Sequence, residues 1–98
     1  MSDDVERALR LRLYVAGDAA NSMVAIANLR AVIAECADGQ ADVEIIDILS
    51  DPERGLHDGV FVTPMLVKVE PTPERRVLGT LSDRPFLLGV LGLAEASP

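Results

Sequence analysis

The sequence predicts one α/β domain whose elements follow the order β-α-β-(short α)-β-β-α. Three observations lead to this prediction. Apolar and polar residues alternate over Leu9–Ala16, apolar residues recur with a helical period over Met23–Ala37, and two strand-like stretches flank a proline-rich turn between Pro64 and Gly79. Because 98 residues suffice for one hydrophobic core, we expect 1–98 to form a single domain with its core at about 9–94.

The charge balance indicates the class of partner. The net charge is −7, and residues 1–59 carry twelve acidic and five basic side chains, whereas residues 60–98 carry four of each. Nucleic acid is disfavoured as a partner, because neutralising phosphates requires a net basic surface. Any partner should therefore be a protein with its own basic surface. The sequence has no apolar run of transmembrane length and starts with the acidic Met1–Asp4, so we expect a cytoplasmic protein with no membrane partner.

The first strand is predicted to have one buried face. Its alternation sends Leu9, Leu11, Leu13 and Val15 to one side and Arg10, Arg12 and Tyr14 to the other. Arginines are costly to bury in a sheet covered on both faces. We therefore expect the second face to be only partly covered, or to meet another subunit.

The first helix is predicted over Met23–Ala37, after a loop over Gly17–Ser22 in which Asn21 or Ser22 caps the helix. Gly39 would end the helix. The helical period places these side chains inward: Ile26, Leu29, Ile33 and Cys36. It places these outward: Asn28, Glu35 and Asp38. Cys36 is thus expected to be a small buried hydrophobe.

A second strand, Val43–Leu49, is predicted to run parallel to the first, because a helix separates them. Asp51 should then cap a helix that starts at Pro52 and that Gly55 and Gly59 limit to one or two turns. His57 has no second His or Cys nearby, so we expect it on the surface.

The second half contains the prolines. Thr63–Pro64 should introduce a strand ending near Val69, and we predict a cis bond there; the following turn leads to a strand ending near Leu78. The apolar stretch Phe86–Ala94 fits either a helix or a buried strand, and we choose a helix because Ser82 or Asp83 can cap it, with Pro85 in its first turn.

This order of elements is that of a thioredoxin-like domain, and the residues themselves indicate a family. The matching motifs, in order, are Leu13-Tyr14-Val15-Ala16-Gly17, Asn21-Ser22, Ile46-Asp47, Thr63-Pro64-x-Leu66-x-Lys68, Pro71-x-Pro73-x-Arg75-Arg76 and Gly79-x-Leu81-Ser82-Asp83-Arg84. Together they closely resemble the KaiB family of circadian-clock proteins, from about Leu9 to Leu93. Each motif alone is weak, but six in the right order are specific.

The resemblance implies a non-enzymatic protein that binds a KaiC-like RecA-class ATPase and modulates its phosphorylation or ATPase cycle. It also implies a homo-oligomer, a dimer or tetramer, and an alternative fold: the KaiB-specific ground-state arrangement β-α-β-β-α-α-β, reached by fold switching. The stretches 51–60 and 86–94, where helix and strand signals conflict, fit such switching. The competing interpretation is a redox-inactive thioredoxin-like sensor or protein-binding module that does not switch.

The sequence does not predict a catalytic, cofactor or metal site. With one Cys and one His, and neither a phosphate-loop motif nor a dinucleotide motif, we expect no enzyme, cofactor or metal. A thioredoxin carries its redox pair in the loop that here reads Gly-Asp-Ala-Ala-Asn-Ser, which excludes thiol–disulfide chemistry.

Nine residues are predicted to bind a partner: Asn21, Ser22, Thr63, Pro64, Lys68, Arg75, Arg76, Asp83 and Arg84. Alternatives stay open for most of them. In the alternative interpretation, Asn21, Ser22 and Asp83 cap helices and do not contact a partner. The three arginines can be solvated or serve self-association.

Overall fold

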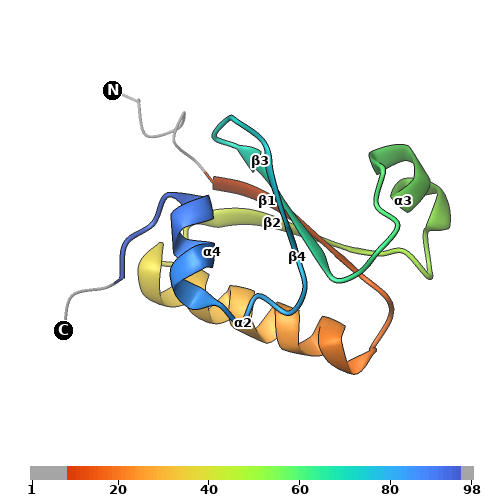
Figure 1. The fold of residues 1–98 in the computed structure, drawn as a ribbon, viewed down its shortest axis with the longest axis horizontal. Helices are drawn as coiled ribbons and strands as arrows, with labels where there is room; N and C mark the ends of the chain where they lie inside the picture. Colours follow the sequence, from red (N-terminus) through yellow and green to blue (C-terminus); the bar gives the residue numbers. More distant parts are fainter. Residues whose placement is uncertain (1–8, 96–98) are drawn as a thin grey trace.

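A computed structural model describes residues 9–95. The chain folds as β1 (Leu9–Val15), α2 (Ala20–Cys36), β2 (Ala41–Asp47), α3 (Pro52–Asp58), β3 (Met65–Glu70), β4 (Arg75–Leu78) and α4 (Arg84–Leu91) (Figure 1). This is the predicted thioredoxin-like order. Within the described residues, none of the helices combines the length and the apolar character that crossing a bilayer requires.

The four strands form one mixed sheet in the order β2-β1-β3-β4. β1 and β2 pair in parallel from Leu9 opposite Ala41 to Val15 opposite Asp47, as the intervening helix predicts. β3 runs antiparallel to β1, and β4 runs antiparallel to β3. β2 and β4 are therefore the two edges of the sheet.

The main core lies between the sheet and two helices. α2 and α4 cover the same face (Figure 1), and the inward side chains of β1 pack against them. The core includes Leu9, Leu11, Leu13 and Val15 of β1, Ala25, Leu29, Val32 and Ile33 of α2, and Leu87, Leu88, Val90 and Leu91 of α4. The core is wholly aliphatic because these elements supply no aromatic side chain to it.

The second face of the sheet is only partly covered, which confirms the expectation from the β1 alternation. A small apolar cluster of Tyr14, Ile46, Val60 and Val67 lies near α3. Farther along β1 the face is polar: Arg10 Nε lies 3.6 Å from an Asp42 carboxylate oxygen, and Arg12 Nε lies 3.8 Å from Glu44.

The predicted caps start both short helices, and α3 ends at the predicted Gly59, whereas α4 ends at Leu91, before the predicted Ala94. The Asp51 side chain accepts from the Arg54 N–H at the start of α3, and Gly59 ends the helix in the left-handed region at φ +71°. In α4 the Asp83 side chain accepts from the Phe86 N–H, so Asp83, not Ser82, is the cap.

Four predictions about α2 were wrong: its start, its cap, the burial of Cys36 and the outward position of Asn28. The helix begins at Ala20, inside the predicted loop, and no side chain caps it. Ser22 is buried in the first turn, and its hydroxyl oxygen instead accepts from the Ala16 N–H at 3.1 Å. Cys36 is only half-buried, and Asn28 is half-buried rather than outward because its amide reaches the β4–α4 loop. The second strand begins and ends two residues earlier than predicted.

Candidate functional site

The β1–α2 loop and the segment before β3 leave the sheet at the same end. Tyr14 pairs with Met65 in antiparallel register, so Val15, which follows Tyr14, and Pro64, which precedes Met65, lie at the same end of the sheet. We call this end the Pro64 edge and define it by residues 17–24, Leu49 and residues 61–64. The Thr63–Pro64 bond is cis, as predicted. The Pro64 carbonyl oxygen accepts from the Gly79 N–H at 2.9 Å, which fixes the end of β4 beside Pro64.

One carboxylate organises the loops of the Pro64 edge. Asp47, the last residue of β2, accepts from the Gly17 N–H at 2.8 Å and from the Leu49 N–H at 2.9 Å. These N–H groups, that of Gly17 first, hold the pKa of Asp47 below its ordinary value. The β1–α2 loop is therefore fastened both by Asp47 and by Ser22.

Apolar side chains are exposed at the Pro64 edge. Phe61 is 73% exposed and Val62 is 54% exposed, although the buried Pro64 follows only two residues after Val62. The other exposed large apolar side chains at this edge are Met23, Val24 and Leu49. No cysteine lies in residues 17–24, so this surface offers contacts and no thiol chemistry.

The predicted partner-binding residues are not all brought together. Asn21, Ser22, Thr63 and Pro64 lie at the Pro64 edge. Arg84 instead contacts Glu35 at 2.8 Å and the Cys36 sulfur at 3.3 Å, at the opposite end of α2. Residues 21 and 35 of one helix are separated by about 21 Å along its axis.

Lys68 and Asp83 make contacts within the chain. Lys68 is buried, and its ammonium donates to the carbonyl oxygens of Pro71 and Pro73, the latter at 2.9 Å. Asp83 is the cap of α4. Arg75 is exposed on β4. The partner-binding assignment of all nine residues stays a prediction.

A polar node near α3 was missed by the sequence reasoning. An Asp58 carboxylate oxygen accepts from the Tyr14 hydroxyl at 2.5 Å and from Arg54 Nε at 2.9 Å. The hydrogen bond from Tyr14 is the largest cause that lowers the pKa of Asp58 far below its ordinary value. Burial, and then the Asp58 hydrogen bond, raise the pKa of Tyr14. The two residues are 44 apart in sequence, and no local pattern connects them.

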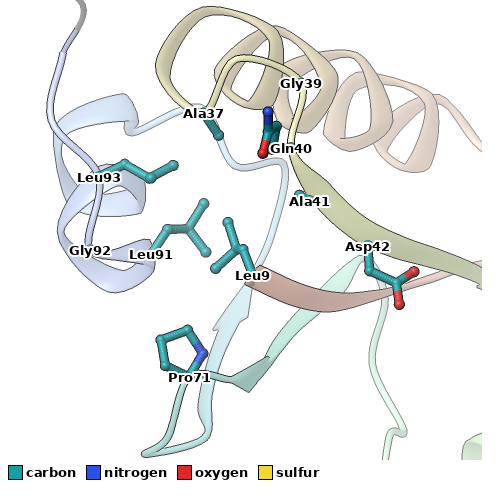
Figure 2. A pocket seen from close by; sticks show the side chains of 10 residues that line it. All are labelled: Leu9, Ala37, Gly39, Gln40, Ala41, Asp42, Pro71, Leu91, Gly92 and Leu93. Carbon is teal, nitrogen blue, oxygen red and sulfur yellow. The ribbon is translucent and has the colours of Figure 1, made fainter. Parts of the chain in front are cut away.

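A cavity away from the Pro64 edge lies between the start of β1 and the end of α4 (Figure 2). Its volume is about 950 Å³, and it is lined mainly by Leu9, Ala37, Pro71, Leu91 and Leu93. Asp42 supplies the single titratable side chain among its described lining residues. Within residues 9–95 no group of three or more His, Cys, Asp and Glu side chains could hold a metal ion.

The fold is shared with thioredoxins. Chloroplastic thioredoxin z superposes with a TM-score of 0.72 at 20% identity, over 91% of this chain and 80% of that one. The N-terminal domain of Synechococcus elongatus SasA superposes with a TM-score of 0.60 at 21% identity, over 86% of this chain and 80% of that one. At these identities the likeness establishes a thioredoxin-like fold and nothing further.

Sequence relatives identify the family. The KaiB domain model matches residues 12–93. A circadian clock oscillator protein KaiB of Prochlorococcus marinus is 41% identical over 78 residues, which cover 80% of this chain and 67% of that protein. The circadian clock protein KaiB3 of a Synechocystis species is 41% identical over 83 residues, covering 85% of this chain and 79% of that protein. The chain therefore belongs to the KaiB family of circadian clock proteins.

Proposed function

We propose that this protein is a non-enzymatic regulator that binds a KaiC-like ATPase of the RecA class through its Pro64 edge. Binding would modulate the phosphorylation or ATPase cycle of that ATPase in circadian or related timing or stress regulation. The observation that carries the proposal is the exposed apolar surface at the Pro64 edge, in a member of the KaiB family.

The composition of the Pro64 edge suits protein recognition. Apolar side chains gathered on one surface are typical of interaction sites, whereas singly scattered ones are not. Phe61 is an aromatic side chain that can anchor in a partner's pocket, and such anchors dominate interface energetics. Asn21 and Thr63 would add polar contacts at the rim of the interface.

Purified protein and a KaiC-like ATPase from the same host provide the test. Affinity is measured by biolayer interferometry with ATP and with ADP, and co-elution by size-exclusion chromatography. We expect a complex with the unchanged chain, and Phe61→Ala should weaken it by about tenfold or more. Ile45→Ala, which truncates a partly exposed apolar side chain on the β2 edge, is the matched control and should change affinity by less than about twofold.

Absence of co-elution in every nucleotide state would contradict the proposal. The protein would then be better described as the redox-inactive thioredoxin-like module. A complex that Phe61→Ala and Ile45→Ala weaken equally would preserve the partner but move its binding site away from the Pro64 edge.

The family resemblance also supports self-association and a second fold. We propose that the chain forms a dimer or tetramer in which its second half rearranges, so that the whole domain has the order β-α-β-β-α-α-β. Multi-angle light scattering measures the oligomer, and two full sets of amide resonances in slow exchange would reveal both folds. A monomer with one thioredoxin-like set of resonances would contradict this part of the proposal.

A further inference from the structure

The Asp58 carboxylate lies where α3 meets the sheet. Its side chain is 10% exposed and contacts three side chains: the Tyr14 hydroxyl at 2.5 Å, Arg54 Nε at 2.9 Å and His57 Nδ1 at 2.9 Å. Tyr14 comes from the middle of the sheet and is 1% exposed. A single carboxylate thus joins the end of α3 to β1.

Arg54 extends this connection to the edge strand β2. Its guanidinium binds Glu44 through two hydrogen bonds of 3.1 Å while it holds Asp58. Such a fork-shaped pairing fixes orientation as well as distance. The side of α3 that faces the sheet is therefore held by β1 and β2 together.

Arg76 holds the backbone at the end of α3 from the other edge of the sheet. It donates to the carbonyl oxygens of Asp58 at 2.8 Å and of Gly59 at 3.1 Å. Carbonyl groups at a helix C-terminus lack intrahelical partners, and Arg76 supplies them. Side chains from β1 and β4 therefore contact residues 58 and 59 directly, and Glu44 of β2 acts on them through Arg54.

Residues 60–64 connect α3 to β3 and include Phe61 and Val62, two of the exposed apolar residues of the Pro64 edge. Val60 is buried and packs with Tyr14, Ile46 and Val67. Phe61 and Val62 come next and project into solvent, and Pro64 is buried again. Phe61 and Val62 thus lie on a short segment between two anchored parts of the chain. Residues 58–60 are one anchor, and the buried Pro64 is the other.

We propose that Asp58 is a positioning residue for partner binding: it holds Phe61 and Val62 in the orientation that the partner binds. The inference rests on the function proposed above, with the Pro64 edge as the binding surface. Asp58 itself is not part of that surface: its side chain is only 10% exposed and contacts Tyr14, Arg54 and His57. Its effect on affinity passes through the orientation of the 60–62 backbone.

The test combines Asp58→Ala with Phe61→Ala. Phe61→Ala removes the Phe61 contact with the partner directly. Asp58→Ala should weaken binding by about three- to tenfold, because Phe61 is then misplaced. The double variant should bind more tightly than the product of the two separate losses predicts, because Phe61, one of the two side chains that Asp58 positions, is already absent. If the two losses instead multiply, Asp58 does not act through Phe61 and the inference is wrong.

Asp51→Ala is the matched control. It removes a carboxylate from the same helix, where Asp51 accepts from the Arg54 N–H, but it leaves the contacts of residue 58 in place. It should reduce stability and leave affinity within about twofold of the unchanged chain. Equal weakening by Asp51→Ala and Asp58→Ala would show that binding follows the overall stability of α3, which would overturn the inference.

Amide resonances of the free protein separate failure of this inference from failure of the proposed function. Asp58→Ala should shift the resonances of residues 60–63, and Asp51→Ala should not. The shift is expected even if no KaiC-like ATPase binds, so the positioning effect has its own readout. Asp58→Asn, which keeps the size of the side chain and an acceptor for Tyr14, replaces Asp58→Ala if the latter does not fold and should shift the same resonances less. Unshifted resonances in both Asp58 variants would refute the inference.

Discussion

The side-chain amide of Asn28 donates to the carbonyl oxygen of Thr80 at 2.9 Å, across 52 residues of sequence. This bond joins the middle of α2 to the loop between β4 and α4. The same loop contains Leu81, a buried residue at the positive φ of +62°, a conformation that is costly for a leucine. The surrounding contacts must therefore hold the loop in place, and Asn28 is one of them.

Asn28→Ala is expected to destabilise the protein by about 1–2 kcal/mol, because the Thr80 carbonyl group then loses its partner. For a chain of this size the melting temperature should fall by about 4–16 °C. Urea unfolding followed by circular dichroism measures the change. Asn21→Ala, at an exposed position of the same helix, should stay within about 0.5 kcal/mol.

Two helical glycines should respond oppositely to alanine. A Cβ at Gly55 would lie 3.2 Å from Ile48 Cγ2 and 3.3 Å from the Val60 carbonyl oxygen, whereas a Cβ at Gly89 would meet nothing within 4 Å. Gly89→Ala should stabilise by about 0.5–1 kcal/mol through helix propensity. Gly55→Ala should destabilise by about 1 kcal/mol, because crowding outweighs that gain. Denaturant midpoints check both, and a gain from Gly55→Ala would show that Ile48 and Val60 can move aside.

The single tyrosine provides a pH-dependent readout. Burial, then the Asp58 carboxylate, raise the pKa of Tyr14 above its ordinary value of 10.0. The folded state then holds the phenol proton more tightly than the unfolded state. This contribution to stability is full below pH 10 and is lost as pH rises through the folded pKa.

Ultraviolet absorbance of the phenolate should therefore show Tyr14 ionising above pH 10 in the folded protein. Tyr14→Phe should abolish the part of the alkaline stability loss that is due to this group. If Tyr14 ionised in the folded protein with the ordinary tyrosine pKa of 10.0, the burial of Tyr14 near α3 would be contradicted.

Lys68→Met should destabilise by about 1–3 kcal/mol, because the Pro71 and Pro73 carbonyls lose their hydrogen bonds to the buried, charged Lys68 ammonium. Lys68→Arg should not restore stability, since a planar guanidinium cannot take the place of a compact ammonium. Arg75→Gln, at the exposed position that pairs with Lys68 across β3 and β4, is the control for loss of charge. Chemical unfolding distinguishes the three variants. Wild-type stability in Lys68→Met would show that these carbonyl groups are satisfied without the lysine.

The sequence was sufficient for the features that depend on local pattern. The alternation of β1, the Asp51 cap and the Gly59 stop all depend on residues within a few positions of one another, and the parallel direction of β2 follows from the helix between the two strands. The start of α2 was misplaced because Ser22 looks like a cap in isolation. In the folded chain the Ser22 hydroxyl accepts instead from the Ala16 N–H in the preceding loop.

The candidate site was less predictable. Thr63–Pro64 was found because an X-Pro pair before a strand is a local signal. Lys68 reads as a surface charge, but its role depends on where the following turn directs its carbonyl groups. Asp58 gave no signal at all, because its partner Tyr14 approaches only after β1 and α3 have packed. Contacts between distant side chains need the tertiary structure before they can be recognised.

The register between β1 and β2 also limits how the chain can change in length. α2 has 17 residues and spans about 26 Å, close to the roughly 23 Å of the seven-residue β1 that it crosses. Four residues on each side, 16–19 and 37–40, complete the connection. One residue inserted into α2 would rotate everything after it by about 100° about the helix axis, turning Leu29 or Ile33 away from the sheet. This half of the molecule should therefore accept substitutions far more readily than insertions or deletions.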